Sequence, residues 1–351
     1  MSLPRTPSSL SSGLPDLTRE RVRSILFVSS LYESFILAED GLLNEAMQTK
    51  FLDLHLVQAP GLTQVPSGAQ ALELLRAGDD FDLVITGINV GDMDAVRLAH
   101  AVREAAPKVP VMLLAHDYPA LKALRARYDT SRLEGLFLWE GDARLLVAMV
   151  KLLEDRRNLA HDARVGVPIL LVVEDNVRNY SSFLPVIYAE IMRYVEQVTA
   201  QGMSLSQRML RFRGRPKILL ATTFEEAWRI FHTYPDNVLG VISDVDFPRG
   251  GISDPGAGVE LARRIHAQRP DVPISLHSSH PQNAVLAHSL GCAFLWKRSA
   301  DLLHQLRKQL ADEHPGVVCS DGRLYLGIRE DVAERPLRPL TRQADCMQAP
   351  L

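Results

Sequence analysis

The chain has 351 residues, which corresponds to roughly two domains of about 150 residues each. Its composition of 46% hydrophobic and 23% charged residues is that of an ordinary soluble globular protein and excludes a wholly disordered, collagen-like or rod-shaped coiled-coil chain. Lysine plus arginine total 39 against 42 for aspartate plus glutamate, and the formal net charge is −3. A globally basic nucleic-acid binder is therefore not expected.

Apolar runs and cysteines both indicate a cytoplasmic protein. The run from Ile169 to Val173 is among the longest without interruption, whereas a membrane span needs about 20 apolar residues. The first residues, MSLPR, lack the charged-then-apolar order of a signal peptide. The three cysteines, Cys292, Cys319 and Cys346, are far apart and form no C-x-x-C pair. Neither a disulfide framework nor a zinc ribbon is indicated.

The first half of the chain alternates short apolar runs with amphipathic stretches. Residues 1–20 are rich in serine and proline without apolar periodicity and predict a flexible leader. The strands expected next cover 25–28, 51–57, 82–86, 109–115 and 135–139. The helices expected between and after them cover 68–78, 93–105, 119–128 and 142–157. This order is typical of parallel β-α units.

The same order restarts after a polar connector predicted over 155–166. The expected strands cover 168–173, 217–221, 238–243, 273–279 and 292–296. The expected helices are a long region reaching about Met209, then 224–234, 258–268, 281–291 and 300–310. The triplet Phe-Leu-Trp occurs at the fifth strand of both halves, at 137–139 and 294–296, which supports an internal repeat of a whole domain. We expect an α/β protein with two doubly wound, five-stranded parallel sheets in tandem.

Polar side chains follow the strands of the second half. Glu174 and Asp175 follow its first strand, and Asp244 ends its third, with Asp246 two residues further on; Ser278 ends its fourth, and Lys297 follows its fifth. In open parallel sheets, ligands bind beyond the carboxyl ends of the strands. Clustered carboxylates repel one another unless a cation lies between them, and Mg²⁺ prefers oxygen ligands. A lysine and a hydroxyl beside them complete a setting for phosphoryl transfer.

These residues resemble the receiver domain of bacterial response regulators, a flavodoxin-like fold, over about 167–311. The motifs that carry the resemblance are 169-ILLVVEDN, 240-GVISDVDFP, 273-PISLHSS and 291-GCAFLWK. The resemblance implies that Asp244 is the phospho-acceptor and that Ser278 and Lys297 contact the phosphoryl group. It also implies that Phe294 is the switch residue. The implied Mg²⁺ ligands are Glu174, Asp175, Asp244 and the backbone carbonyl of Asp246.

Four features depart from the family pattern, and one of them is that Phe294 lacks the phenolic hydroxyl of some members. An insertion over 176–215 follows the first strand, about six extra residues over 251–256 follow the acceptor strand, and Arg298 stands where the family usually has proline. The basic stretch 208–217 within and beyond the insertion could contact nucleic acid, but we expect a solvated inserted segment. None of the departures removes a charged group that the chemistry requires.

The first half resembles a receiver domain whose functional residues are replaced. Ser29 and Ser30 stand for the acidic pair, Gly87 for the acceptor aspartate, Ala115 for the serine or threonine and Glu140 for the lysine. Without carboxylates at these positions there is no Mg²⁺ site, and without the aspartate there is no acyl phosphate. We interpret this half as a pseudo-receiver retained for its surfaces.

The expected organisation is a leader over 1–20, a pseudo-receiver over 21–158, a receiver over 166–312 and a tail over 313–351. The tail is too short for a familiar DNA-reading module, so signalling proceeds by protein contact, or the chain is the regulatory front part of a longer protein. The resemblance implies a sensor histidine kinase or a phosphotransfer protein as partner, together with a downstream protein effector. A homodimer is left open, and neither a membrane nor nucleic acid is expected as a partner.

Other interpretations remain at this stage. The chain could be a phosphorylation-independent scaffold of two receiver-like folds, or an enzyme that hydrolyses a phosphoester with Mg²⁺. Asp175 and Ser278 could serve only as helix caps. His280 and Asp246 could tune hydrolysis of an aspartyl phosphate. We expect a phosphorelay protein, which is not an enzyme apart from slow self-dephosphorylation.

Overall fold

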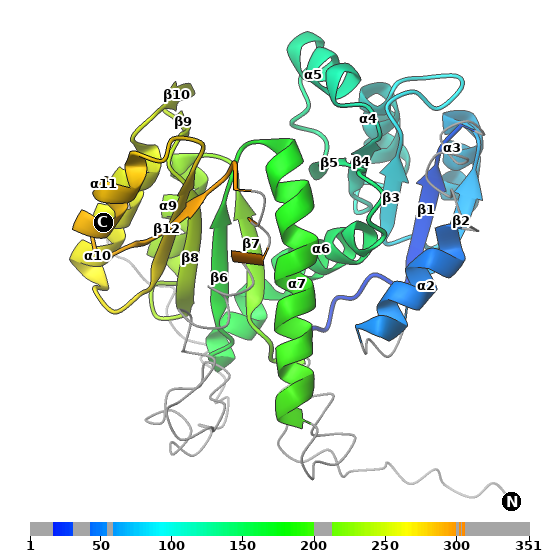
Figure 1. Cartoon of the computed structure of the whole chain (residues 1–351). Coiled ribbons are helices and arrows are strands. Elements are labelled where there is room, and N and C mark those ends of the chain that lie inside the picture. The colour runs from blue at the N-terminus through cyan, green and yellow to red at the C-terminus, as the bar shows by residue number, and fades with distance from the viewer. Residues whose placement is uncertain are drawn as a thin grey trace, which may run out of the picture.

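The computed structural model describes residues 17–30, 43–54, 59–199, 213–299, 302 and 304–305. Within them the chain forms two five-stranded parallel sheets with helices packed on them (Figure 1). The strand order is β2-β1-β3-β4-β5 in the first sheet and, read from the matching edge, β7-β6-β8-β11-β12 in the second. Both sheets have the order 2-1-3-4-5 of flavodoxin-like, doubly wound folds. The predicted fold class is confirmed.

The first sheet and its helices fill residues 24–162. Its strands are β1 (Ser24–Val28), β2 (Gly61–Val65), β3 (Leu83–Thr86), β4 (Val111–Ala115) and β5 (Gly135–Leu138). Its helices are α2 (Leu43–Asp53), α3 (Gly68–Ala77), α4 (Ala95–Ala105), α5 (Tyr118–Arg127) and α6 (Arg144–Asp162). Side-chain caps define two helix starts, since Ser67 accepts from the backbone N–H of Gln70 and Asp94 accepts from that of Arg97.

The strand expected over 51–57 is wrong. Residues 51–53 end α2, and the second strand lies at Gly61–Val65. Met47 and Phe51 are one helical turn apart and both buried, whereas Leu52 is 68% exposed, so the apolar run is one face of a helix. The true strand has the sequence GLTQV, lies at the edge of the sheet and buries only Val65. It therefore leaves almost no apolar signal.

The second sheet follows the predicted order. Its strands are β6 (Ile169–Val173), β7 (Lys217–Ala221), β8 (Val238–Asp244), β11 (Ile274–Ser278) and β12 (Ala293–Trp296). Its helices are α7 (Val177–Thr199), α9 (Phe224–Thr233), α10 (Ala257–Gln268) and α11 (Asn283–Ser289). The extra residues after the acceptor strand belong to a hairpin of β9 (Phe247–Arg249) and β10 (Ile252–Asp254). The end of the long helical region beyond Thr199, most of the helix over 300–310 and the whole tail lie outside the described residues.

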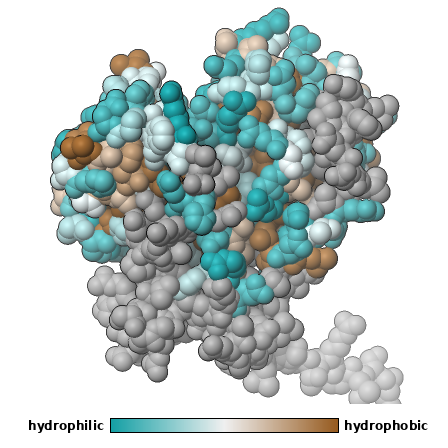
Figure 2. Space-filling view, viewed as in Figure 1, coloured by the Kyte–Doolittle hydropathy of each residue, from teal (hydrophilic) through white to brown (hydrophobic). Residues whose placement is uncertain are grey.

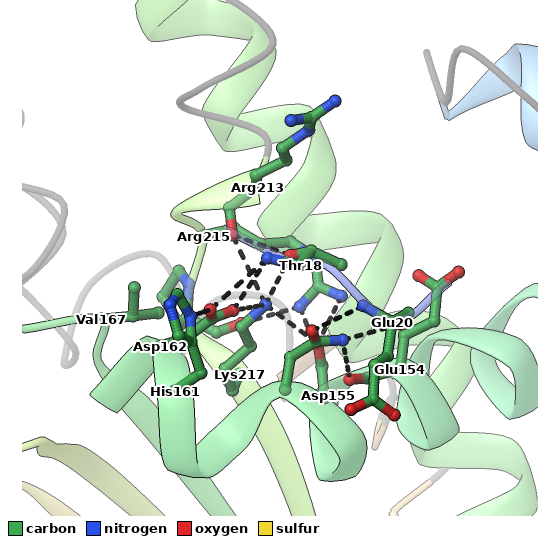
Figure 3. A network of polar contacts seen from close by, with 12 residues as sticks. Thr18, Glu20, Glu154, Asp155, His161, Asp162, Val167, Arg213, Arg215 and Lys217 are labelled. Atoms are coloured by element: carbon green, nitrogen blue, oxygen red, sulfur yellow. Dashed lines mark hydrogen bonds and ion pairs between the residues drawn. The ribbon is translucent and has the colours of Figure 1, made fainter. Parts of the chain in front are cut away.

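The polar connector predicted over 155–166 is also wrong, because the segment continues α6 and ends in a 3₁₀ turn, Ala163–Val165. Its acids are buried in a network that joins the two domains (Figure 3). Asp155 receives two hydrogen bonds of 2.9 Å from Arg215 and one of 3.0 Å from the Tyr188 hydroxyl. Lys217 Nζ lies 2.8 Å from Asp162 Oδ2. The acidic residues of this segment are therefore buried and form ion pairs, rather than being exposed to solvent.

The end of the predicted flexible leader is docked on this network. Leu17 is 4% exposed, and the backbone N–H of Thr18 donates to Asp162 Oδ2 at 3.2 Å. The backbone N–H of Glu20 donates to Asn158 Oδ1 at 2.9 Å. The leader prediction is therefore wrong for residues 17–20, while residues 1–16 lie outside the described part of the chain.

The end of the basic stretch 208–217 is likewise not solvated, because residues 215–217 are buried. Arg215 and Lys217 are 4% and 1% exposed and are paired with Asp155 and Asp162. Neither side chain is available to nucleic acid. Residues 208–212 lie outside the described residues.

The two domains share an apolar core. One cluster of buried side chains runs from the first sheet through α6 to α7 and onto one side of the second sheet, where it includes Leu170, Val172 and Leu220. Helix α7 stands between the sheets and packs on both α6 and β5 (Figure 1). A second cluster covers the other side of the second sheet. The described residues include no helix with the length and apolar character of a membrane span.

Candidate functional site

Four strand ends of the second sheet meet at one edge and carry the predicted site residues. Strands β6, β8, β11 and β12 are consecutive neighbours in the sheet. In the register of the sheet, Val173 pairs with Ser243, His277 with Asp244, and Ser278 with Trp296. The strands thus end at nearly the same level, which places the residues after them side by side.

The three carboxylates of this edge form a compact cluster. One ligand atom each from Glu174, Asp175 and Asp244 lies within 4.8 Å of the others. Glu174 and Asp244 are buried and Asp175 is half-buried. Lys297 Nζ lies 2.6 Å from Glu174 Oε2 and 2.5 Å from Asp244 Oδ2. Three carboxylates face a single ammonium group, so the cluster remains electronegative.

Burial and mutual repulsion shift the proton affinities of this cluster. The pKa of Glu174 is raised to about 7, chiefly by burial; the charge of Lys297 opposes the rise, and the charge of Asp244 adds to it. Burial and the charge of Asp244 also raise the pKa of Asp175. Burial alone would lower the pKa of Lys297, but Glu174 and Asp244 outweigh it and hold that pKa above its ordinary value.

The donor set fits a hard divalent cation. Carboxylate oxygens are the ligands that Mg²⁺ prefers, usually one or two carboxylates together with water and phosphate oxygens. Glu174 Oε2 is a buried oxygen that receives no hydrogen bond within the described part of the chain, and the ammonium group of Lys297 lies 2.6 Å from it. Glu174, Asp175 and Asp244 would hold the cation. The metal role assigned to the Asp246 carbonyl stays a prediction, and the Asp246 side chain is exposed and accepts from Ser253 Oγ at 2.8 Å.

Backbone contacts orient Asp244, the predicted phospho-acceptor. The N–H of Val245 donates to Asp244 Oδ1 at 2.7 Å, and Ser243 Oγ donates to the Asp244 carbonyl at 2.7 Å. A Cβ on Gly258 would lie 2.0 Å from that same carbonyl oxygen. Only glycine permits this approach of α10 to the end of β8.

Ser278 ends β11, and Phe294 lies on the neighbouring strand β12; their predicted phosphate and switch roles stay predictions. Ser278 Oγ accepts from the N–H of His280 at 3.1 Å and from Asn283 Nδ2 at 2.9 Å. Helix α11 begins at Asn283 without a side-chain cap, so Ser278 does not act as its helix cap. Its hydroxyl hydrogen remains available as a donor. Phe294 is half-buried against the second apolar cluster.

Sequence reasoning missed two side chains that contact the acids. Asn179 Nδ2, from the first turn of α7, donates to Glu174 Oε1 at 3.2 Å. His277 is buried on β11, its Nδ1 lies 3.6 Å from Glu174 Oε2, and its ring packs edge-on against Phe183. Burial, reinforced by the charge of Lys297, lowers the pKa of His277 well below its ordinary value, which makes this histidine neutral. Neither residue stands at a strand end, the position that drew attention to the others.

The corresponding edge of the first sheet has other residues at the positions of the acids, the serine and the lysine. Ser29 is buried and accepts from Gln64 Nε2 at 3.2 Å, and Ala115 is fully buried. The N–H of Gly87 donates to the Val28 carbonyl at 3.0 Å. Of the described residues, only those of the second sheet form a group of three potential metal ligands. Ser30 and Glu140 complete the replaced positions, and Glu140 forms an ion pair of 3.1 Å with Arg178 of α7.

The surface is hollowed between the two domains at the top of Figure 2, on a face where hydrophilic residues predominate. A cavity of about 300 Å³ lies between the domains beside the acid cluster. Arg125 and Arg156 of the first domain and Asp175 and Tyr180 of the second line it. Asp175 therefore belongs to the acid cluster and also lines the cavity between the domains.

No protein-family model and no curated protein matches the chain. Among solved structures, it is similar to a response regulator receiver protein from Sinorhizobium medicae, with 21% identity over 39% of this chain and 98% of that one, and a TM-score of 0.28. It is also similar to the signal receiver domain of an HD domain-containing protein from Pseudomonas fluorescens, with 24% identity over 40% of this chain and 97% of that one, and a TM-score of 0.28.

A third similar structure spans more of the chain. It is described as a probable two-component system response regulator/GGDEF domain protein, and the match has 15% identity over 83% of this chain and 98% of that one, with a TM-score of 0.33. The solved structures to which this chain is similar thus include receiver domains of response regulators, alone and joined to a GGDEF domain.

Proposed function

We propose that the chain is a two-component phosphorelay protein in which Asp244 accepts a phosphoryl group in a Mg²⁺-dependent step and thereby switches protein contacts. The observation that carries the proposal is the convergence of Glu174, Asp175 and Asp244 on one sheet edge, with Lys297 joining two of them. A nucleophile, a cation site and a charged group for phosphate oxygens are the parts that phosphoryl transfer needs.

The transfer forms one bond and breaks one. A carboxylate oxygen of Asp244 attacks the phosphorus of the donor, and the P–N bond of a phosphohistidine or the P–O bond of an acyl phosphate breaks. The donor keeps the electron pair and takes up a proton where its chemistry requires one. The product on the protein is a mixed anhydride of Asp244. Bound Mg²⁺ would supply neutralisation of the phosphoryl oxygens.

The residues around Asp244 have defined tasks in this step. The N–H of Val245 holds Asp244 Oδ1 at 2.7 Å and keeps the carboxylate oriented. Lys297 contacts Asp244 before transfer, and its ammonium group pairs with a phosphoryl oxygen afterwards. Ser278 donates its hydroxyl hydrogen to another phosphoryl oxygen.

The switch follows from the same contacts. Ser278 Oγ accepts a hydrogen bond from Asn283, the first residue of α11. A phosphoryl group that binds the Ser278 hydroxyl therefore alters this contact at the start of α11. Phe294, on the neighbouring strand β12, responds to this movement. A sensor histidine kinase or a phosphotransfer protein supplies the phosphoryl group, and a downstream protein reads the altered surface.

The test is incubation with Mg²⁺ and acetyl phosphate, followed by intact-mass analysis of wild type, Asp244→Asn and Asp246→Asn. We expect one phosphoryl group on wild type and on Asp246→Asn, which alters a neighbouring exposed carboxylate but keeps the backbone carbonyl. Asp244→Asn and samples with chelator should carry none. Absence of the adduct from wild type, under conditions that label an ordinary response regulator, would instead support a phosphorylation-independent scaffold. Turnover of a phosphoester in excess of protein would support a hydrolase.

A further inference from the structure

Glu174 and the start of α7 form one hydrogen-bonded unit, and Asp175 lies on the connection between them. Strand β6 ends at Val173 and α7 begins at Val177, so the connection is short. Glu174 Oε1 accepts from the N–H of Asn176 at 3.1 Å and from Asn179 Nδ2 at 3.2 Å. Asn176 Oδ1 in turn accepts from the N–H of Arg178 at 3.0 Å. A displacement of the first turn of α7 therefore displaces the acids.

Side chains of the first domain contact this hydrogen-bonded unit. Glu140 forms an ion pair of 3.1 Å with Arg178. The guanidinium of Arg178 lies over the ring of Tyr118, 4.7 Å from its centroid. The Tyr118 hydroxyl donates to Asn176 Oδ1 at 3.5 Å. Two side chains of the first domain thus contact two residues of the unit that carries the acids.

The next turn of α7 is fixed to the same domain through β5. The Tyr180 hydroxyl donates to the Leu136 carbonyl at 2.5 Å, and Ser181 Oγ accepts from the N–H of Leu138 at 3.0 Å. The ring of Tyr180 also packs edge-on against Phe137. Because β5 is an edge strand, these side chains satisfy backbone groups that would otherwise be unpaired. The first domain is therefore a fixed support for the start of α7.

Glu140 occupies the position in the first domain that Lys297 occupies in the second, directly after the Phe-Leu-Trp triplet. A lysine at this position would repel Arg178, whereas a glutamate attracts it. We infer that Glu140 and Tyr118 are positioning residues that hold the β6–α7 connection, and that the first domain thereby preorganises Glu174 and Asp175 for a divalent cation. The inference rests on the cation site of the proposed function, but not on phosphorylation of Asp244.

The first experiment measures the Mg²⁺ dissociation constant of the full chain by isothermal titration calorimetry. The ion pair is exposed on both sides, at 45% for Glu140 and 56% for Arg178, so Glu140→Gln should weaken binding about two- to fivefold. Tyr118→Leu should act in the same direction. Glu140→Arg should weaken binding at least as much, and the charge swap Glu140→Arg with Arg178→Glu should restore it.

A matched control comes from the same connection between β5 and α6. Asp142 pairs with Arg144 at 2.8 Å and is similarly exposed, so Asp142→Asn should leave the dissociation constant unchanged. A second readout is amide hydrogen exchange over residues 174–180 in metal-free protein. Exchange should be faster in Glu140→Arg and return to the wild-type rate in the charge swap.

The outcomes separate this inference from the proposed function. Equal Mg²⁺ affinity and equal exchange in wild type, Glu140→Arg and Tyr118→Leu would overturn the inference, even if Asp244 is phosphorylated. If the charge swap restores both readouts while Asp244 takes up no phosphoryl group, the positioning role stands and the phosphorelay proposal fails.

Discussion

Glu174 couples metal binding to pH because its pKa lies near neutral pH in the metal-free chain. Its pKa is raised to about 7 by burial, so the carboxyl is mostly neutral at pH 6 and mostly ionised at pH 8. A metal ligand must be deprotonated, so the proton and the cation compete. We expect Mg²⁺ affinity to fall about tenfold between pH 8 and pH 6, in proportion to the ionised fraction.

Calorimetric titrations at the two pH values check this prediction. Glu174→Gln should bind Mg²⁺ more weakly and lose most of the dependence, because the amide does not titrate. Equal wild-type affinity at pH 6 and pH 8 would show that Glu174 is ionised throughout this range.

At the scale of single residues, the sequence predicted which side chains lie close together where their position at a strand end determines it. Asp244 ends a strand, and Glu174 and Lys297 directly follow strands of the same parallel sheet, so strand order brings them together before any side-chain contact is known. The pairing of Arg215 with Asp155 could not be found this way. The two residues lie on different elements far apart in the sequence. The sequence around Arg215 does not indicate whether its side chain is exposed to solvent or buried in an ion pair.

At the scale of elements, burial determines what the sequence can predict. Strands β6 and β11 are buried at every residue and were found, whereas edge strand β2 is mostly exposed and was missed. The hairpin β9–β10 was missed because Phe247 is the only fully buried residue of its two short strands. The replaced positions of the first domain were predicted, but the contact of Glu140 with Arg178 depends on how the domains pack.

The crossing of α10 over the end of β8 requires Gly258. A Cβ there would lie 2.0 Å from the Asp244 carbonyl oxygen and 2.9 Å from Val245 Cα, and these backbone atoms cannot rotate away. We expect Gly258→Ala to lower the free energy of unfolding by about 3 kcal/mol and to weaken Mg²⁺ binding by displacing Asp244. Urea denaturation followed by circular dichroism measures the first effect.

Gly256→Ala is the matched control for this substitution. Its added Cβ would lie 3.5 Å from the nearest atom, Asp254 Oδ1, which is an ordinary contact. Its unfolding free energy should stay within about 0.5 kcal/mol of wild type. If Gly258→Ala is equally mild, α10 can move away from the acceptor strand without cost.

At the scale of the whole molecule, the buried ion network ties α6 of the first domain to β7 of the second. Asp155 accepts four hydrogen bonds, from Arg215, Tyr188 and the N–H of Ile218. Asp155→Asn leaves Arg215 buried without its counter-charge, and we expect a loss of about 3–5 kcal/mol in unfolding free energy. The exposed Asp142→Asn should cost less than about 1 kcal/mol in the same urea denaturation experiment. Similar small losses in both variants would mean that the network is solvated.

The shared core makes a further prediction about cooperativity. Side chains of α7, such as Leu184 and Ile187, belong to the same buried cluster as the first sheet, so unfolding of either domain exposes apolar surface of the other. The two domains should therefore unfold in one transition, unlike domains joined by a free linker. Trp139 packs against the shared cluster and Trp228 against the second cluster, so each reports one domain.

Fluorescence of two variants tests this coupling: Trp139→Phe keeps the probes of the second domain, and Trp228→Phe with Trp296→Phe keeps the probe of the first. Coincident urea midpoints are expected, because neither domain retains a complete core without the other. In Asp155→Asn both midpoints should fall together, since the substitution weakens the junction on which both domains depend. A first-domain transition that precedes the second would contradict the shared core. It would also remove the basis for the first domain acting as a fixed support of the acid cluster, because that support requires both domains to be folded whenever the site is formed.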